Sequence, residues 1–114
     1  MDLTGKRFDR LTEKKMKKML RMVIDYYGAD HQLSKAIEEQ AELIHVIARR
    51  LQSKEWDVES FLEEFADVYV IFDQMKLIYC AETGADLHQL DNELDKRKCE
   101  KMKRTLRRID KENE

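Results

Sequence analysis

Two pairs of acidic residues are spaced so that they could bind a metal ion. Glu39 and Glu42 lie three residues apart in "AIEEQAELIHVIARRL" (36–51), and Glu64 and Asp67 have the same spacing in "SFLEEFADVYVIFDQM" (60–75). Side chains three residues apart share one face of a helix, so each pair can converge on one point. If the two helices pack antiparallel, the four carboxylates face one another and repel strongly. Mg²⁺ or Mn²⁺ would relieve that repulsion, because both ions prefer carboxylate oxygens and water.

The alternative is that these acids belong to solvated helix faces. The chain has 24 Asp and Glu residues, and one such pair by itself would indicate no more than a charged surface. Here two pairs occur on consecutive helices beside an apolar seam, and neither seam is expected to contain Lys or Arg. Arg49 and Arg50 follow two turns later. This arrangement favours a metal site.

The elements that must position these acids are helices. The chain of 114 residues has no Pro and only three Gly, which are the main interrupters of helices. Four helices are expected, separated by three short breaks. The predicted helix caps are Thr12, Asp30, Asp57 and Asp86, and Gly28 and Gly84 end the first and third helices.

Helical periodicity predicts the faces on which these helices pack. The expected core face of the second helix comprises Leu33, Ile37, Ile44, Ile47 and Leu51. One seam of the third helix comprises Glu64, Asp67, Ile71, Gln74 and Ile78. The predicted fold is all-α, a four-helix-bundle-like protomer of antiparallel helices. It forms one domain over 1–114, with a flexible N-terminus over 1–11.

Charge and composition exclude several classes of function. The net charge of −2 and the pI near 6.0 argue against a nucleic-acid partner. No apolar run approaches the roughly 20 residues that span a bilayer, so no membrane association is expected. The first residues, "MDLTGKRFDR", contain no apolar export signal, and Cys80 and Cys99 form no metal-binding pair. A cytoplasmic protein with reduced thiols is expected.

The acidic motifs resemble those of a known family. "EEQAE" (38–42) followed by "EFAD" (64–67) is similar to the EExxE…ExxD signature of the MazG-type, all-α nucleoside triphosphate pyrophosphohydrolases, and the resemblance extends over 26–110. It implies Mg²⁺-dependent hydrolysis of an NTP or dNTP to the monophosphate and pyrophosphate, with Mn²⁺ as a substitute. It also implies a homodimer or homotetramer. The implied metal ligands are Glu39, Glu42, Glu64 and Asp67, with Glu38 as a helper that orients water.

Further residues are candidates for binding the substrate. The last helix carries a basic seam at 4–3–4 spacing, formed by Arg97, Lys101, Arg104 and Arg108. Lys101, Arg104 and Arg108 could hold phosphate oxygens, or they could form a solvated helix end that complements the helix dipole. Many members of the family carry Asn in this last motif, where this chain has Thr105. Gln32 shares a stripe with Glu39 and could read a base edge, or be a polar boundary residue.

Two other functions compete with hydrolysis. Glu42 and His45 form an ExxH pair, which is typical of di-iron carboxylate bundles, but that site needs a second ExxH and the chain has none at the required place. A non-enzymatic helical interaction module is the other alternative, because the last helix is highly charged. Dependence on Mg²⁺ would separate these functions from pyrophosphohydrolase activity.

Overall fold

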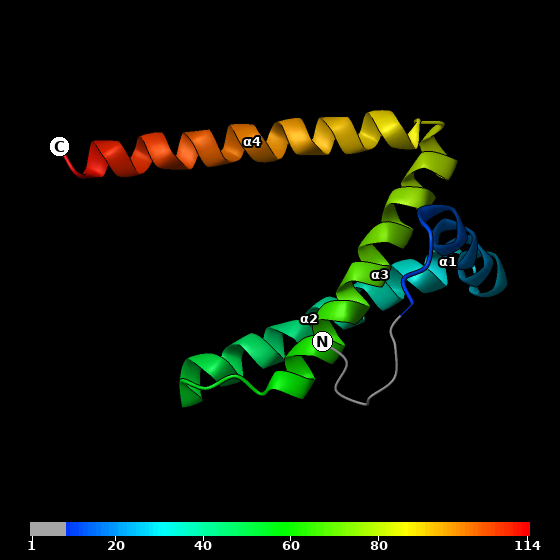
Figure 1. The fold of residues 1–114 in the computed structure, drawn as a ribbon, viewed down its shortest axis with the longest axis horizontal. Helices are drawn as coiled ribbons and strands as arrows, with labels where there is room; N and C mark the ends of the chain where they lie inside the picture. The colour runs from blue at the N-terminus through cyan, green and yellow to red at the C-terminus, as the bar shows by residue number, and fades with distance from the viewer. Residues whose placement is uncertain (1–8) are drawn as a thin grey trace. The chain divides into compact units, whose positions relative to one another are not determined.

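The computed structural model describes residues 9–114, and within that range the chain is all-α (Figure 1). It has four helices and no strands there: α1 (Glu13–Tyr27), α2 (Ala29–Ser53), α3 (Val58–Thr83) and α4 (Leu87–Glu112). The expected all-α class with four helices is therefore confirmed. Most of the predicted flexible N-terminus lies outside the described residues. Across residues 9–114, no helix combines the length and the apolar character needed to cross a membrane.

Three of the four predicted caps begin helices as expected. The Thr12 hydroxyl accepts a hydrogen bond from the backbone N–H of Lys15, at 3.2 Å. Asp57 caps α3 by accepting from the backbone N–H of Ser60, also at 3.2 Å. Asp86 caps α4 in the same way, through the N–H of Gln89 at 3.1 Å. These contacts are local, which is why the sequence predicts them well.

The predicted cap at Asp30 is wrong. α2 already begins at Ala29, so Asp30 lies in its first turn, and the residue at the cap position is Gly28. Gly28 has a φ of 94°, a conformation that side chains disfavour. The glycine therefore turns the chain from α1 directly into α2, and no side-chain cap is made.

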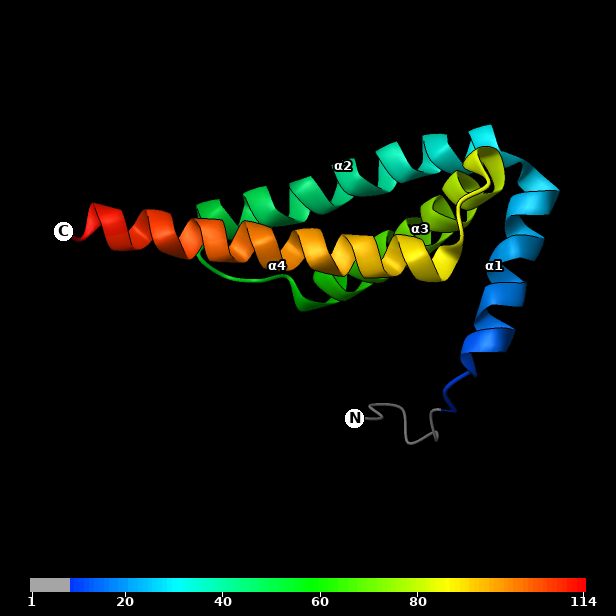
Figure 2. The same cartoon turned by 90° about the horizontal axis from the view of Figure 1, so that it is seen from above.

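The chain forms two compact units whose boundary falls inside α3, between Met75 and Lys76. In the first unit, α2 and the first part of α3 run antiparallel as a hairpin (Figure 2). Near the turn, Arg49 lies 3.9 Å from Asp57. Towards the other end, the Gln32 side chain donates to Gln74 at 2.8 Å. In each pair the two residues are equally far along the chain from the α2–α3 turn, so the hairpin keeps one register along its length.

The predicted core face of α2 is wrong. Ile37, Ile44 and Leu51 are 73%, 63% and 59% exposed in the single chain. The neighbouring face, which contains Ala36 and Val46, is buried instead. Hydrophobic periodicity shows that this face of α2 is apolar, but it does not show which face the neighbouring helices cover. By contrast, the predicted seam of α3 is buried at three positions, Ile71, Gln74 and Ile78.

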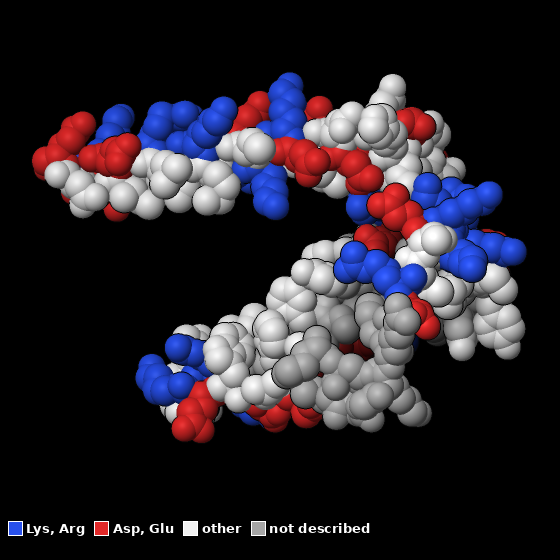
Figure 3. Space-filling model, viewed as in Figure 1, with Lys and Arg blue, Asp and Glu red and all other residues white. Residues whose placement is uncertain are grey.

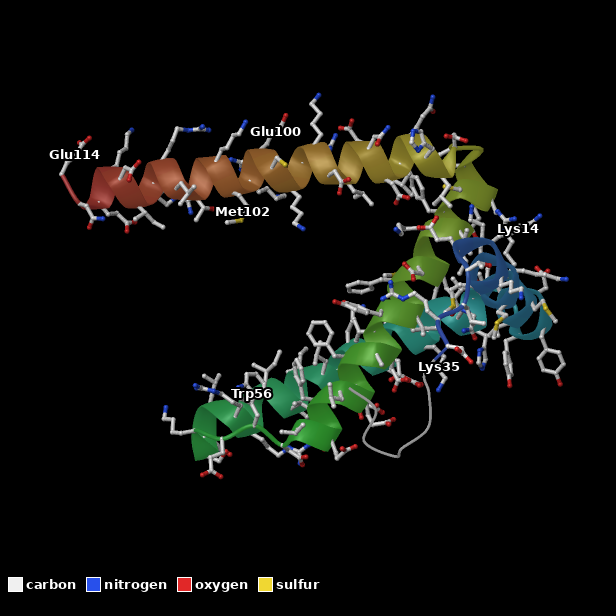
Figure 4. The ribbon with its side chains drawn as sticks, in the orientation of Figure 1. Lys14, Lys35, Trp56, Glu100, Met102 and Glu114 are labelled. Carbon is white, nitrogen blue, oxygen red and sulfur yellow. The ribbon has the colours of Figure 1, made fainter. Side chains whose placement is uncertain are left out.

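The second unit comprises the end of α3 and all of α4. Lys76 donates to Asp91 at 2.9 Å, which ties the end of α3 to the start of α4. From 92 onwards every α4 side chain is exposed. Lys and Arg gather along one edge of this part of α4, and uncharged side chains lie along the opposite edge (Figure 3). The side chains of Glu100 and Met102 lie on opposite sides of this helix (Figure 4).

Candidate metal centre

The α2–α3 hairpin brings four carboxylates together. Glu39 and Glu42 of α2 and Glu64 and Asp67 of α3 each offer one oxygen, and these four oxygens lie within 4.8 Å of one another. Each pair occupies adjacent turns of its helix, so the i,i+3 spacing directs both side chains to one place. All four residues lie in the first unit. The structure therefore brings together the four acids that were predicted as metal ligands.

The register of the hairpin explains this convergence. Asp67 lies beside Glu39 and raises its pKa, and Glu42 lies beside Glu64 and raises its pKa. As with Gln32 and Gln74, the two residues of each pair are equally far along the chain from the α2–α3 turn. Each acid of α2 thus faces one acid of α3, one helical turn apart, and the two motifs meet because they are equally far from the α2–α3 turn.

Two oxygens of the cluster are buried without a partner. The Glu39 side chain is only 13% exposed. Among the residues that the structure describes, neither Glu39 Oε2 nor Glu64 Oε2 has a hydrogen-bond partner. An unpartnered buried polar atom is unfavourable, so natural proteins rarely leave one. Glu42 and Asp67 are exposed, which leaves the cluster open to solvent on one side. Buried carboxylate oxygens beside an open face fit a hard divalent cation.

The carboxylates also perturb one another's titration. The pKa of Glu39 is raised by burial and, to a smaller extent, by the charges of Asp67 and Glu42. The pKa of Glu64 is raised to about 7, first by the hydrogen bond with Glu42 and then by burial and the neighbouring acids. Without a cation, the cluster therefore retains protons at a pH where isolated carboxylates have lost them.

One basic side chain reaches the cluster, contrary to the expectation that neither seam contains Lys or Arg. Lys35 Nζ lies 3.8 Å from Glu39 Oε1 and 3.8 Å from Glu38 Oε2 (Figure 4). The signal was present in the sequence, because Lys35 precedes Glu39 by four residues and shares its face. A single partly exposed ammonium group contributes little stabilisation, and it cannot neutralise four carboxylates.

Two residues that the sequence associated with the motif lie outside the cluster. Glu38 is exposed, and its carboxylate is near Lys35 rather than the four converging oxygens. Its role as a helper stays a prediction. His45 is also exposed and is not among the clustered ligands, so the ExxH pair does not form a shared metal site with Glu42 in the described chain.

A cavity of about 300 Å³ adjoins the carboxylates. Glu39 and Asp67 line one part of it, and apolar side chains of α1, including Met16, Met19 and Val23, line another. All three helices of the first unit contribute to its walls. The cavity therefore provides an apolar space in direct contact with the cluster.

Gln32 and Gln74 are the two uncharged polar residues of the cavity wall. Gln32 is 6% exposed and Gln74 is 1% exposed, so Gln32 is a buried residue and not a boundary residue. Sequence reasoning assigned no role to Gln74. Its partners, Gln32 and the carbonyl of Leu20, are 42 and 54 residues away in the chain, and local spacing gives no sign of such contacts.

The candidate phosphate-binding residues lie on α4, in the second unit. Arg104 and Arg108 line a surface depression of about 310 Å³ together with Arg107 and Lys111. Lys101 is exposed, and its carbonyl accepts a hydrogen bond from the Thr105 hydroxyl at 2.9 Å. The proposed contact of Lys101, Arg104 and Arg108 with phosphate stays a prediction.

Comparisons with protein-family models, with curated proteins and with solved structures find no match for this chain.

Proposed function

We propose that this protein is a Mg²⁺-dependent hydrolase that converts a nucleoside triphosphate or deoxynucleoside triphosphate to the monophosphate and pyrophosphate. One observation carries the proposal. Four carboxylates from two helices place oxygens within 4.8 Å of one another, and two of their buried oxygens have no partner among residues 9–114. The resemblance of the two acidic motifs to the MazG-type signature supports the reaction class.

The four acids would hold the cation, with Mn²⁺ as a substitute for Mg²⁺. A bound divalent ion neutralises negative charge on the phosphate oxygens and lowers the pKa of an adjacent water. Glu39 and Glu64 contribute the unpartnered buried oxygens, and Glu42 and Asp67 contribute oxygens on the solvent side. A carboxylate that is not occupied as a ligand can accept the proton of the attacking water. Glu38, one residue before Glu39, is the candidate for orienting that water.

Basic side chains would stabilise the charge that develops on the phosphates. Lys35 lines the cavity and lies beside Glu39, so it can reach an anion bound at the cluster. Arg104 and Arg108 are further candidates, because the guanidinium group binds phosphate oxygens in pairs. Lys101 is another, because its ammonium group carries a positive charge. Their exposed positions leave their hydrogen-bonding groups available to a ligand.

The functional form would be a homodimer or homotetramer in the cytoplasm, acting in the control of the nucleotide pool. The exposed stripe of α2, defined by Ile37, Ile44, Ile47 and Leu51, supports self-association. A small domain that leaves such a stripe in water gains stability by covering it with a second copy.

One observation favours an interaction module as the second candidate. α4 leaves four large apolar side chains exposed, namely Leu94, Met102, Leu106 and Ile109. These residues could bind a partner helix without any chemistry at the carboxylates. The module would not need Mg²⁺, so metal dependence separates the two candidates.

The experiment is a product analysis with a panel of NTPs and dNTPs. Phosphorus NMR should show one monophosphate and one pyrophosphate for each triphosphate consumed, in the presence of Mg²⁺ and not with EDTA. Release of inorganic phosphate with a diphosphate would show a different bond cleavage. A folded protein that consumes no member of the panel would favour the interaction module.

A further inference from the structure

We infer that the cavity beside the carboxylates binds the base of the nucleotide, and that Gln32 and Gln74 select bases that carry a ring carbonyl group. The kind of ligand rests on the proposed function. The selectivity rests on the buried hydrogen bonds of the two glutamines, which line the same cavity as Glu39 and Asp67.

The Leu20 carbonyl determines which atoms donate and which accept in the hydrogen bonds of Gln74 and Gln32. Gln74 Nε2 lies 3.3 Å from the Leu20 carbonyl oxygen, and a carbonyl can only accept. Gln74 must therefore turn its amide nitrogen towards Leu20 and its oxygen towards Gln32. Gln32 Nε2 donates to that oxygen at 2.8 Å. The Gln32 oxygen then faces His31 Nδ1 at 2.8 Å, so that ring nitrogen must carry the proton.

Each amide nitrogen retains one N–H group for a ligand. A glutamine side chain has two N–H donors, and the structure gives each nitrogen one acceptor among residues 9–114. Both side chains are more than nine-tenths buried, so these donors have little access to bulk water. A buried donor without an acceptor is unfavourable. Both amide oxygens already accept one hydrogen bond, and leaving the second lone pair of each oxygen unpaired is less unfavourable than leaving an N–H group unpaired.

The remainder of the cavity suits a flat heterocycle. Its volume of about 300 Å³ is at the lower end of the usual range for small-molecule sites. Met16, Met19 and Val23 provide an apolar wall, and methionine adapts to aromatic faces. Glu39 and Asp67 belong both to this cavity and to the metal cluster. A base in the cavity would therefore leave its phosphates on the side of the carboxylates.

A ring carbonyl group is the complement of the two amide donors that line one cavity. Its oxygen has two lone pairs and can accept from both amide nitrogens. An amino group at the same ring position would place donors against donors and leave both N–H groups unpaired. Sites that hydrogen-bond a substrate in this way discriminate strongly against analogues that lack the group.

The test compares ITP with ATP, because inosine carries a C6 carbonyl and an N1–H group where adenosine carries a C6 amino group and an unprotonated N1, and the two share ribose and phosphates. For the wild-type chain with Mg²⁺, kcat/KM should be at least about tenfold higher for ITP, because ATP would leave one or two buried N–H groups unpaired. The substitution Gln74→Met removes the amide and keeps the volume, and it should bring the ratio close to one. Gln40→Met is the matched control, because Gln40 lies on α2 outside the cavity lining and should leave the ratio unchanged.

A second measurement needs neither metal nor hydrolysis. With EDTA present, inosine should shift the side-chain amide signals of Gln32 and Gln74 in a nitrogen-15 NMR spectrum, and adenosine should not. If ITP is hydrolysed and Gln74→Met leaves the ratio intact, the inference is overturned and the proposed function stands. If no triphosphate is hydrolysed and inosine still shifts the two amides, the reaction is wrong and the base site stands. Unshifted amides in the wild-type chain overturn the inference directly, whatever the fold of the variant.

Discussion

Glu64 shows how a shared site changes the behaviour of a single residue. Its hydrogen bond with Glu42, its partial burial and the neighbouring acids all act in the same direction and raise its pKa to about 7. The unfolded chain has no such neighbours, so the pKa of its Glu64 would lie near 4.5, the ordinary value for a glutamate. Between these two values the folded chain binds more protons than the unfolded chain.

This difference predicts that the metal-free chain loses stability as the pH rises from about 4.5 to 7, because protons are released that the folded state had retained. Urea unfolding in EDTA, measured across that range, tests the direction. The substitution Glu64→Gln should remove a large part of the decline, because its amide does not titrate.

Glu63→Gln is the matched control for this measurement. Glu63 is the preceding residue of α3, is exposed, and is not among the clustered ligands. Its substitution should leave the pH dependence as in the wild type. A decline that is equally steep in the Glu64 variant would show that this carboxyl does not control the effect.

Among the elements, α3 depends on a cap beside the turn of the hairpin. Asp57 accepts hydrogen bonds from both the backbone N–H and the hydroxyl of Ser60, at 3.2 and 3.0 Å. Replacing it with Ala should lower the free energy of unfolding by about 1 kcal/mol, as usual for the loss of a helix cap. Urea unfolding at constant pH measures this loss. Glu63→Ala, in the same helix, should cost less, and equal losses in both variants would contradict the role of the cap.

The elements also show what can be predicted from the sequence. The caps at Thr12, Asp57 and Asp86 were predictable because capping involves only residues three positions apart. The i,i+3 acids were predictable for the same reason. Their meeting follows from the hairpin, since both motifs lie at equal distances from one turn.

What could not be predicted depends on neighbouring helices. The stripe containing Ile37 and Ile44 reads as a core face, and only the positions of α1 and α3 show that another face is covered. The cavity and the contact between Gln74 and Leu20 arise from residues far apart in sequence. Lys35 was a different case, because its spacing from Glu39 was visible in the sequence.

For the whole molecule, the exposed apolar stripe of α2 predicts an oligomer. Sedimentation velocity should show a dimer or tetramer of the wild-type chain. Ile44→Asp should shift it towards the monomer, because a carboxylate within an apolar interface must lose its water. In a monomer the same change would matter little, since Ile44 is 63% exposed there.

Gln52→Asp is the control for this prediction. Gln52 is an exposed polar residue of α2, so its substitution adds the same charge outside the isoleucine stripe. It should leave the sedimentation coefficient unchanged. A wild-type chain that sediments as a monomer at high micromolar concentration would contradict the proposed assembly.

The central claim is that the four carboxylates form one divalent-cation site that hydrolyses a nucleoside triphosphate. The most direct measurement is the rate of pyrophosphate release against Mg²⁺ concentration for the wild type, Glu39→Gln, Asp67→Asn and the control Glu63→Gln. The wild type and the control should require Mg²⁺ equally. In the two ligand variants the rate of pyrophosphate release should fall more than about a hundredfold, while their helical circular dichroism stays intact. Substituting even a residue that only supports a metal ligand lowers activity by about 10–100-fold. Full Mg²⁺-dependent activity in both ligand variants would contradict the account.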